Sequence, residues 1–162
     1  ETSQSKTIFL EDLDPGSRTF SLDIYLKSEH AECLVVGRIQ VQEKDQKSWR
    51  IRQYFKKKKK KGRIDLKGSA QGESSLEFDG SAVVEKNSQD GEVQVEERVI
   101  LFDQAKARVV PVLTVKTQAV KKASHAASVA PINPEKIRYC ASRGIAPKEA
   151  LRLIKKGFLA LP

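Results

Sequence analysis

Four side chains in this sequence could bind a soft metal ion or act as nucleophiles, namely His30, Cys33, His125 and Cys140. The two cysteines lie far apart in the chain and form neither a CxxC pair nor a dense disulfide framework. We therefore expect two free thiols, buried or half-buried, which suits a reducing cytosol. His30, in KSEHAEC, is expected in a surface loop, and Cys140, on the first of two C-terminal helices, is expected to be a core thiol.

The sequence lacks the motifs of common enzyme classes. It contains no HExxH zinc motif, no phosphate-binding loop and no glycine-rich dinucleotide fingerprint. Acidic residues such as Glu96 and Glu97 lie in an alternating segment and are expected to face solvent. We therefore predict that the chain is not an enzyme.

A run of lysines, Lys56–Lys61, supplies most of the formal net charge of +9. Like charges in a row repel one another and cannot pack, so we expect a solvated loop. The alternative is a basic module that binds a polyanion by neutralising phosphates. Nucleic-acid modules usually combine such charge with aromatic residues and a groove. Only Tyr54 and Phe55 precede the run, and Phe55 has inward parity, so nucleic acid is the less favoured partner.

The first 120 residues alternate between apolar and polar positions, as half-buried β-strands do. No helical period occurs before residue 131, and no apolar run is long enough to span a membrane. The pattern leaves a sandwich, a barrel or a β-solenoid. Aromatic residues make up only 6% of the chain, which favours the narrow interior of a solenoid. The alternating segments are FSLDIYLK, CLVVGRIQV, SWRIRQYF, RIDLKGSA, LEFDGSAVV, EVQVEERVIL and RVVPVLTV.

The last part of the chain reads as two short basic helices. Asn133 is the expected N-cap of the first, with Pro134 at its first position and Gly144 just beyond its end. The second is expected to begin at Pro147 and to end at Gly157. Helices this short are unstable alone, so they must dock on the strands or on another chain.

We therefore divide the chain into a β core over residues 1–130 and a helical pair over residues 131–162. The outer faces of the helices are expected to carry their basic side chains, which are Lys136, Arg138, Lys148, Arg152, Lys155 and Lys156.

The segment ASHAASVAPINPEKIRYCASRGIAPKEALRLIKKGF resembles the C-terminal segment of the SufB/SufD family, the scaffold subunits of SUF-type iron–sulfur cluster assembly. The resemblance extends upstream, over closing β-strands, to about residue 68. Its elements are Ser124-His125, Ser142-Arg143-Gly144-Ile145, Glu149-Ala150, Leu153-Ile154 and Gly157-Phe158.

This resemblance implies a right-handed parallel β-helix capped by two short α-helices. It also implies a cytoplasmic, non-enzymatic scaffold subunit whose helical pair docks a SufC-like, ABC-type ATPase. A second scaffold chain would associate through the β-helix core. The residues expected to contact a partner are Tyr139, Ser142, Arg143, Gly144, Ile145, Glu149, Leu153, Ile154 and Phe158.

The resemblance points to His125 as the retained metal position. Alanine stands at both neighbouring positions that carry ligand-type residues in the family: Ala123 replaces a cysteine and Ala126 replaces a glutamate. Alanine offers neither a thiolate nor a carboxylate. Three alternatives stay open, namely a metal-site role for His125 in binding an iron–sulfur cluster, a histidine that closes a strand end, and a degenerate scaffold without cluster chemistry.

Family members are longer and usually carry an N-terminal helical region. The chain begins at Glu1 and contains no methionine, so we expect either a shortened chain or a minimal member.

Overall fold

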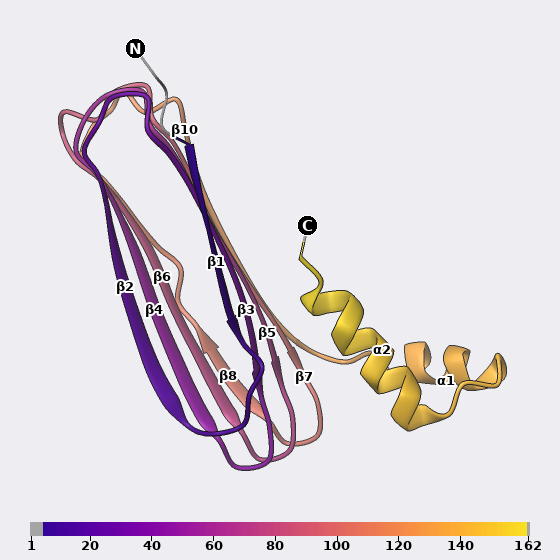
Figure 1. Ribbon diagram of the computed structural model, residues 1–162. Helices are drawn as coiled ribbons and strands as arrows, with labels where there is room; N and C mark the ends of the chain where they lie inside the picture. Colours follow the sequence, from indigo (N-terminus) through magenta and orange to yellow (C-terminus); the bar gives the residue numbers. More distant parts are fainter. Residues whose placement is uncertain (1–4, 162) are drawn as a thin grey trace.

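The computed structural model describes residues 5–161 and shows a β-solenoid with a helical pair at one side (Figure 1). The chain winds between two facing parallel sheets. Sheet A consists of β1 (Ser5–Asp12), β3 (Glu32–Val41), β5 (Lys61–Ala70), β7 (Glu92–Leu101) and β10 (Lys122–Pro131). Sheet B consists of β2 (Arg18–Leu26), β4 (Gln46–Phe55), β6 (Ser75–Val84) and β8 (Lys106–Val109), and β9 (Val112–Val115) also pairs with β6.

The solenoid prediction is confirmed, because every strand pair in the described part of the chain is parallel and joins strands of successive turns. The first residues of the sheet A strands lie in register: Glu32 opposite Lys61, Lys61 opposite Glu92, and Glu92 opposite Lys122. Equivalent side chains of successive turns therefore form columns that run through the whole solenoid.

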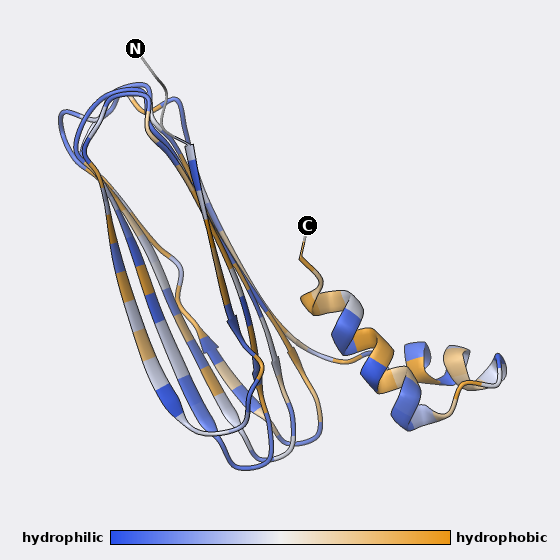
Figure 2. Cartoon of the chain, viewed as in Figure 1, coloured by the Kyte–Doolittle hydropathy of each residue, from blue (hydrophilic) through white to orange (hydrophobic). Residues whose placement is uncertain are grey.

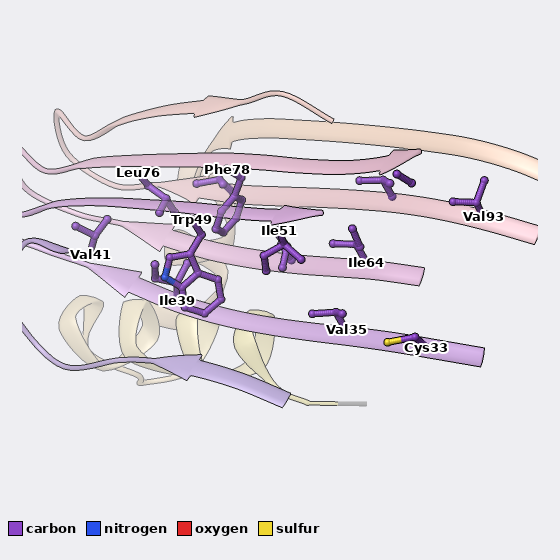
Figure 3. Packing of buried hydrophobic residues seen from close by; sticks show 14 of the residues in the cluster. Cys33, Val35, Ile39, Val41, Trp49, Ile51, Ile64, Leu76, Phe78 and Val93 are labelled. Atoms are coloured by element: carbon purple, nitrogen blue, oxygen red, sulfur yellow. The ribbon is translucent and has the colours of Figure 1, made fainter. Parts of the chain in front are cut away.

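The interior holds a few large rings because glycines in the facing sheet leave them room. Trp49 and Phe78 of sheet B lie with ring centroids 6.4 Å apart (Figure 3). A Cβ atom on Gly37 of sheet A would lie 2.8 Å from Trp49 Cζ3. A Cβ atom on Gly62 would lie 2.2 Å from Phe55 Cζ. Figure 2 shows the alternating hydropathy along the strands that produces this apolar interior.

The turns that join sheet A to sheet B, and sheet B back to sheet A, repeat one backbone conformation from coil to coil. Six corner residues, arranged in two columns, have φ between +53° and +77°, a left-handed conformation that tightens the corner. His30, expected in a loop, belongs to one of these columns and is half-buried. One column follows the sheet B strands and consists of His30, Lys59 and Asp90. The other follows the sheet A strands and consists of Glu43, Gly72 and Asp103.

The helical pair consists of α1 (Pro134–Ser142) and α2 (Pro147–Leu159). The predicted caps are confirmed: the Asn133 side chain accepts a hydrogen bond from the Glu135 amide, and Gly144 has φ of +80°. The predicted end of the second helix is wrong, because α2 continues through Gly157 to Leu159. A helix with strong formers on both sides tolerates one glycine at a modest cost. No helix in residues 5–161 is long and apolar enough to cross a bilayer.

Candidate functional site

The free edge of β10 is the first feature that could carry a function. β10 pairs with β7 on one side only, and nine of its ten residues are exposed. An unpaired strand edge leaves backbone N–H and C=O groups free to bind another strand. Alanine and serine predominate in β10 and allow another chain to approach closely.

His125 lies in this strand, on the face that continues the core. Its register partner is Val95, which is fully buried, whereas His125 is exposed because no turn covers it. Ala123 lies two residues earlier on the same face, and Ala126 faces the opposite side. No group of three or more His, Cys, Asp or Glu side chains in residues 5–161 could hold a metal ion.

The second feature is the docked helix α2, which lies against the outer face of sheet A. Arg38 is 1% exposed, although its place in β3 faces outward, and its Nε donates to the carbonyl oxygen of Ala160 at 3.4 Å. The ammonium group of Lys67 lies 5.8 Å from the ring centroid of Phe158.

The sequence analysis placed Lys155 on an outer basic face of the helices, and this expectation is wrong. Its Nζ donates to the Gln71 side chain and lies 5.1 Å from the Phe102 ring centroid. This lysine therefore faces the solenoid, and burial lowers its pKa.

A groove of about 910 Å³ lies between α2 and the turns that follow the sheet A strands. Its floor is apolar and includes Leu13, Leu151 and Leu159, while Lys148 and Lys156 line it as well. Such a groove could hold an apolar segment of a partner protein.

Helix α1 packs on α2 and buries none of its own residues. Tyr139 is 63% exposed, and the guanidinium of Arg143 lies 5.5 Å from its ring centroid. Leu153 on α2 is 41% exposed. We call the exposed surface formed by Tyr139, Ser142, Arg143, Gly144 and Leu153 the helical platform.

The other residues expected to contact a partner are less accessible. Ile145, Ile154 and Phe158 are half-buried, and Ile154 and Phe158 line a smaller cavity of about 380 Å³ between α2 and the end of β10. Glu149 is held by two hydrogen bonds from Arg152, with the Nε–Oε2 distance at 2.7 Å. The predicted set therefore divides into the exposed platform and a half-buried group.

The lysine run is only partly the solvated loop that the sequence predicts. Lys56–Lys59 are exposed, and Lys56 Nζ lies 5.0 Å from the Tyr25 ring centroid. Lys60 is fully buried, and Lys61 begins β5, where its Nζ lies 3.1 Å from Glu32 Oε1. The solenoid overrides local charge repulsion here, because the backbone of Lys60 must follow the same corner as the turns above and below it.

Glu97 is a further residue that the sequence analysis placed wrongly, because it was expected to face solvent. It is 0% exposed, and no side chain in residues 5–161 donates a hydrogen bond to its carboxyl oxygens. Burial raises the pKa of this carboxyl to about 7, a backbone hydrogen bond from Gly80 opposes the rise, and the negative charge of Asp79 adds to it. The signal was present, because Glu97 has the same parity in β7 as the buried Val95 and Val99.

Comparison with known proteins adds two findings. Residues 13–158 match the family described as SUF system FeS cluster assembly, SufBD core domain. The iron-sulfur cluster assembly protein SufD of Bacillus subtilis (strain 168) is 34% identical over 104 residues, which are 64% of this chain and 24% of that protein. The chain thus spans about a quarter of the length of this relative.

Proposed function

The chain belongs to the SufBD core-domain family of the SUF iron–sulfur cluster assembly system, and we propose that it is a non-enzymatic scaffold subunit of such a complex. As a scaffold it offers two surfaces, the helical platform and the free edge of β10. The two free thiols, Cys33 and Cys140, support a reducing cytosol as its compartment.

The helical platform is the proposed docking surface for a SufC-like, ABC-type ATPase. The observation that carries this proposal is that α1, a helix of nine residues, buries none of them and still presents an aromatic residue to solvent. So short a helix gains little stability from its own hydrogen bonds, and a partner that covers Tyr139 would stabilise it. Because α2 is anchored to sheet A through Arg38, a force on the platform would be passed to the solenoid.

The free edge of β10 is the proposed contact for a second scaffold chain. The argument rests on ten residues whose backbone groups have a strand partner on one side only, together with exposed apolar side chains such as Val129, which is 41% exposed. Pairing of two such edges would satisfy the free backbone groups of both chains. The second chain can be a copy of this one or a related subunit.

The iron–sulfur cluster is cargo in this proposal. His125 is the side chain of β10 that could touch it, and any further ligands would come from the second chain, since Ala123 and Ala126 supply none. A degenerate scaffold without cluster chemistry remains the alternative within the same family. Anaerobic reconstitution with iron and sulfide distinguishes the two by visible absorbance, in the chain alone and in the paired complex.

A polyanion site at the lysine run is the weaker function. Lys60 is buried, Lys61 is paired with Glu32, and Lys56 lies over Tyr25, which leaves three lysines on an exposed turn. Binding to DNA or RNA that falls steeply with salt, and disappears when these lysines are changed to serine, would revive it.

Co-purification with the ABC-type ATPase of the same organism tests the docking proposal. The double variant Tyr139→Ala, Arg143→Ala is expected to lose most of the bound ATPase, because it removes the centre of the platform. Arg50→Ala, on the outer face of sheet B and paired with Asp79, is the matched control and is expected to bind as the wild type does. Equal binding by both variants would contradict the proposal.

A further inference from the structure

Glu97 is an ionisable group inside the solenoid that lies one strand below β10 in sheet A, and neither proposed surface uses it. The Glu97 side chain crosses the interior from β7 towards β6. There, a Cβ atom on Gly80 would lie only 2.3 Å from its Oε1. Glycine at this position therefore leaves the space that the carboxyl group occupies.

Only a thin layer separates this carboxyl group from solvent. On sheet A, the register partner of Glu97 in the last strand is Ala127, whose side chain is a single methyl group. On sheet B, the strand above β6 is interrupted between Val109 and Val112, where Pro111 stands. Towards the other end the register partner is Leu66, which is fully buried. The shortest way from water to Glu97 therefore leads past Ala127 and Pro111.

None of the neighbouring charges compensates an ionised Glu97. Glu96 and Arg98 pair with each other on the outer face of β7, and Asp79 of β6 pairs with Arg50 at 2.8 Å. On β5, the neighbours of Leu66 are Asp65 and Lys67, which have outward parity. On β10, His125 lies two residues before Ala127. These titratable or charged neighbours are Asp65, Lys67, Asp79, Glu96, Arg98 and His125.

We propose that Glu97 is a proton-controlled lock on the open end of the solenoid. When Glu97 is neutral, this end stays closed, with β10 and the β8–β9 connection packed against the interior. Ionisation creates a buried anion to which no described side chain donates a hydrogen bond and which the Gly80 backbone stabilises only in part. The cheapest relief is hydration. Water enters past Ala127 and Pro111, so β10 separates from β7 more often when Glu97 is charged.

This lock needs no second chain, so it goes beyond the scaffold function. One consequence rests on that function: the edge that β10 offers to a second chain is best ordered when Glu97 is protonated. Pairing would therefore weaken as pH rises through neutrality, because the chain would have to order β10 before binding.

Hydrogen exchange of the full chain, followed by mass spectrometry and corrected for the intrinsic rate, tests the lock. We expect β10 amides of the wild type to open at least about tenfold more often at pH 8.5 than at pH 6, because ionisation of a group with a raised pKa favours the open form. Glu97→Gln should abolish this difference, and Glu96→Gln, its outward-facing neighbour, should retain it. Opening that is independent of pH in the wild type, or equally dependent on pH in Glu97→Gln, overturns the proposal.

Two further measurements keep the test decisive. Should Glu97→Gln fail to fold, infrared difference spectra of the wild type decide: a protonated carboxyl band that disappears near pH 7 supports the lock, and its absence overturns it. Sedimentation at both pH values measures self-association separately. A monomer whose β10 opening depends on Glu97 supports the lock and counts only against pairing of identical chains.

Discussion

Arg38 on the second turn of the solenoid donates from its Nε to the carbonyl oxygen of Ala160, 122 positions later in the chain, at 3.4 Å. Its Nη1 lies 3.1 Å from Oδ1 of Asp65 and 2.8 Å from the carbonyl oxygen of Gly37. One guanidinium group thus joins two turns of sheet A to the end of the helical pair. Because it is almost fully buried, this arrangement depends on all of its acceptors being present.

Changing Arg38 to methionine is expected to loosen α2 from sheet A. The variant keeps a side chain of similar length but loses the hydrogen bonds to Ala160 and Asp65, at a cost of about 2 kcal/mol. Hydrogen exchange in residues 147–160 should then rise by about tenfold or more. Arg50→Met removes an exposed pair on sheet B and should leave these amides unchanged. Unaltered protection of α2 in the Arg38 variant would show that other contacts hold the helix.

Two glycine-to-alanine changes are expected to act in opposite directions. At Gly62 the new methyl group would lie 2.2 Å from Phe55 Cζ, so overpacking should destabilise the fold by about 1–3 kcal/mol. At Gly157, inside α2, an added Cβ atom would meet nothing within 4 Å apart from its chain neighbours and the backbone of its own helix. Alanine there should stabilise the fold by about 0.5–1 kcal/mol through helix propensity. Urea unfolding of both variants measures the difference, and equal midpoints would refute the packing argument.

Lys47 is expected to be among the costliest lysines to replace. Its fully buried ammonium donates to Asp12 Oδ1 at 2.7 Å and to the carbonyl oxygens of Asp14 and Gln40 at 2.6 and 2.8 Å. Lys47→Met leaves the nearly buried Asp12 without its closest partner, which should cost about 2–4 kcal/mol in the free energy of unfolding. Lys44→Met, with an exposed side chain, is the control and should change stability by less than about 0.5 kcal/mol.

The stability of the whole chain should carry the signature of Glu97. The unfolded chain releases this proton near the ordinary value of 4.5, and the folded chain releases it near 7. Between these values the folded state binds more protons, so this contribution to stability falls as pH rises and is lost above about pH 7. The loss amounts to about 3 kcal/mol. Denaturation of Glu97→Gln at pH 5 and pH 8 should lack this component, and a slope equal to that of the wild type would argue against it.

Much of the solenoid is readable from alternation, because each strand places every second side chain inside. The inward parity of Trp49, Ile51 and Phe55 is confirmed by their burial. The same rule places Lys47, Gln53 and Glu97 inside, where they are found, although a local reading of polarity assigns glutamate to the surface. Parity was thus a better guide than residue type in these strands.

The remainder depends on contacts between distant segments, which local patterns do not encode. Arg38 has outward parity and is buried only because the end of the chain covers it. Gly80 of sheet B makes room for Glu97 of sheet A only because the two residues face each other across the interior. The length of the turns between the sheets sets which residues face each other. Helix caps, by contrast, depend on neighbours in sequence, and the prediction for Asn133 and Gly144 is therefore correct.

The columns of identical corners have a consequence for how such a protein changes during evolution. Each coil contacts only the coils before and after it. One complete coil can therefore be inserted or deleted while every remaining residue still stacks on an equivalent position. A shorter insertion would shift each later side chain out of its column. Relatives of this architecture should therefore differ in length by whole coils. Insertions shorter than one coil should occur only in the corner turns, where the extra residues can extend into solvent.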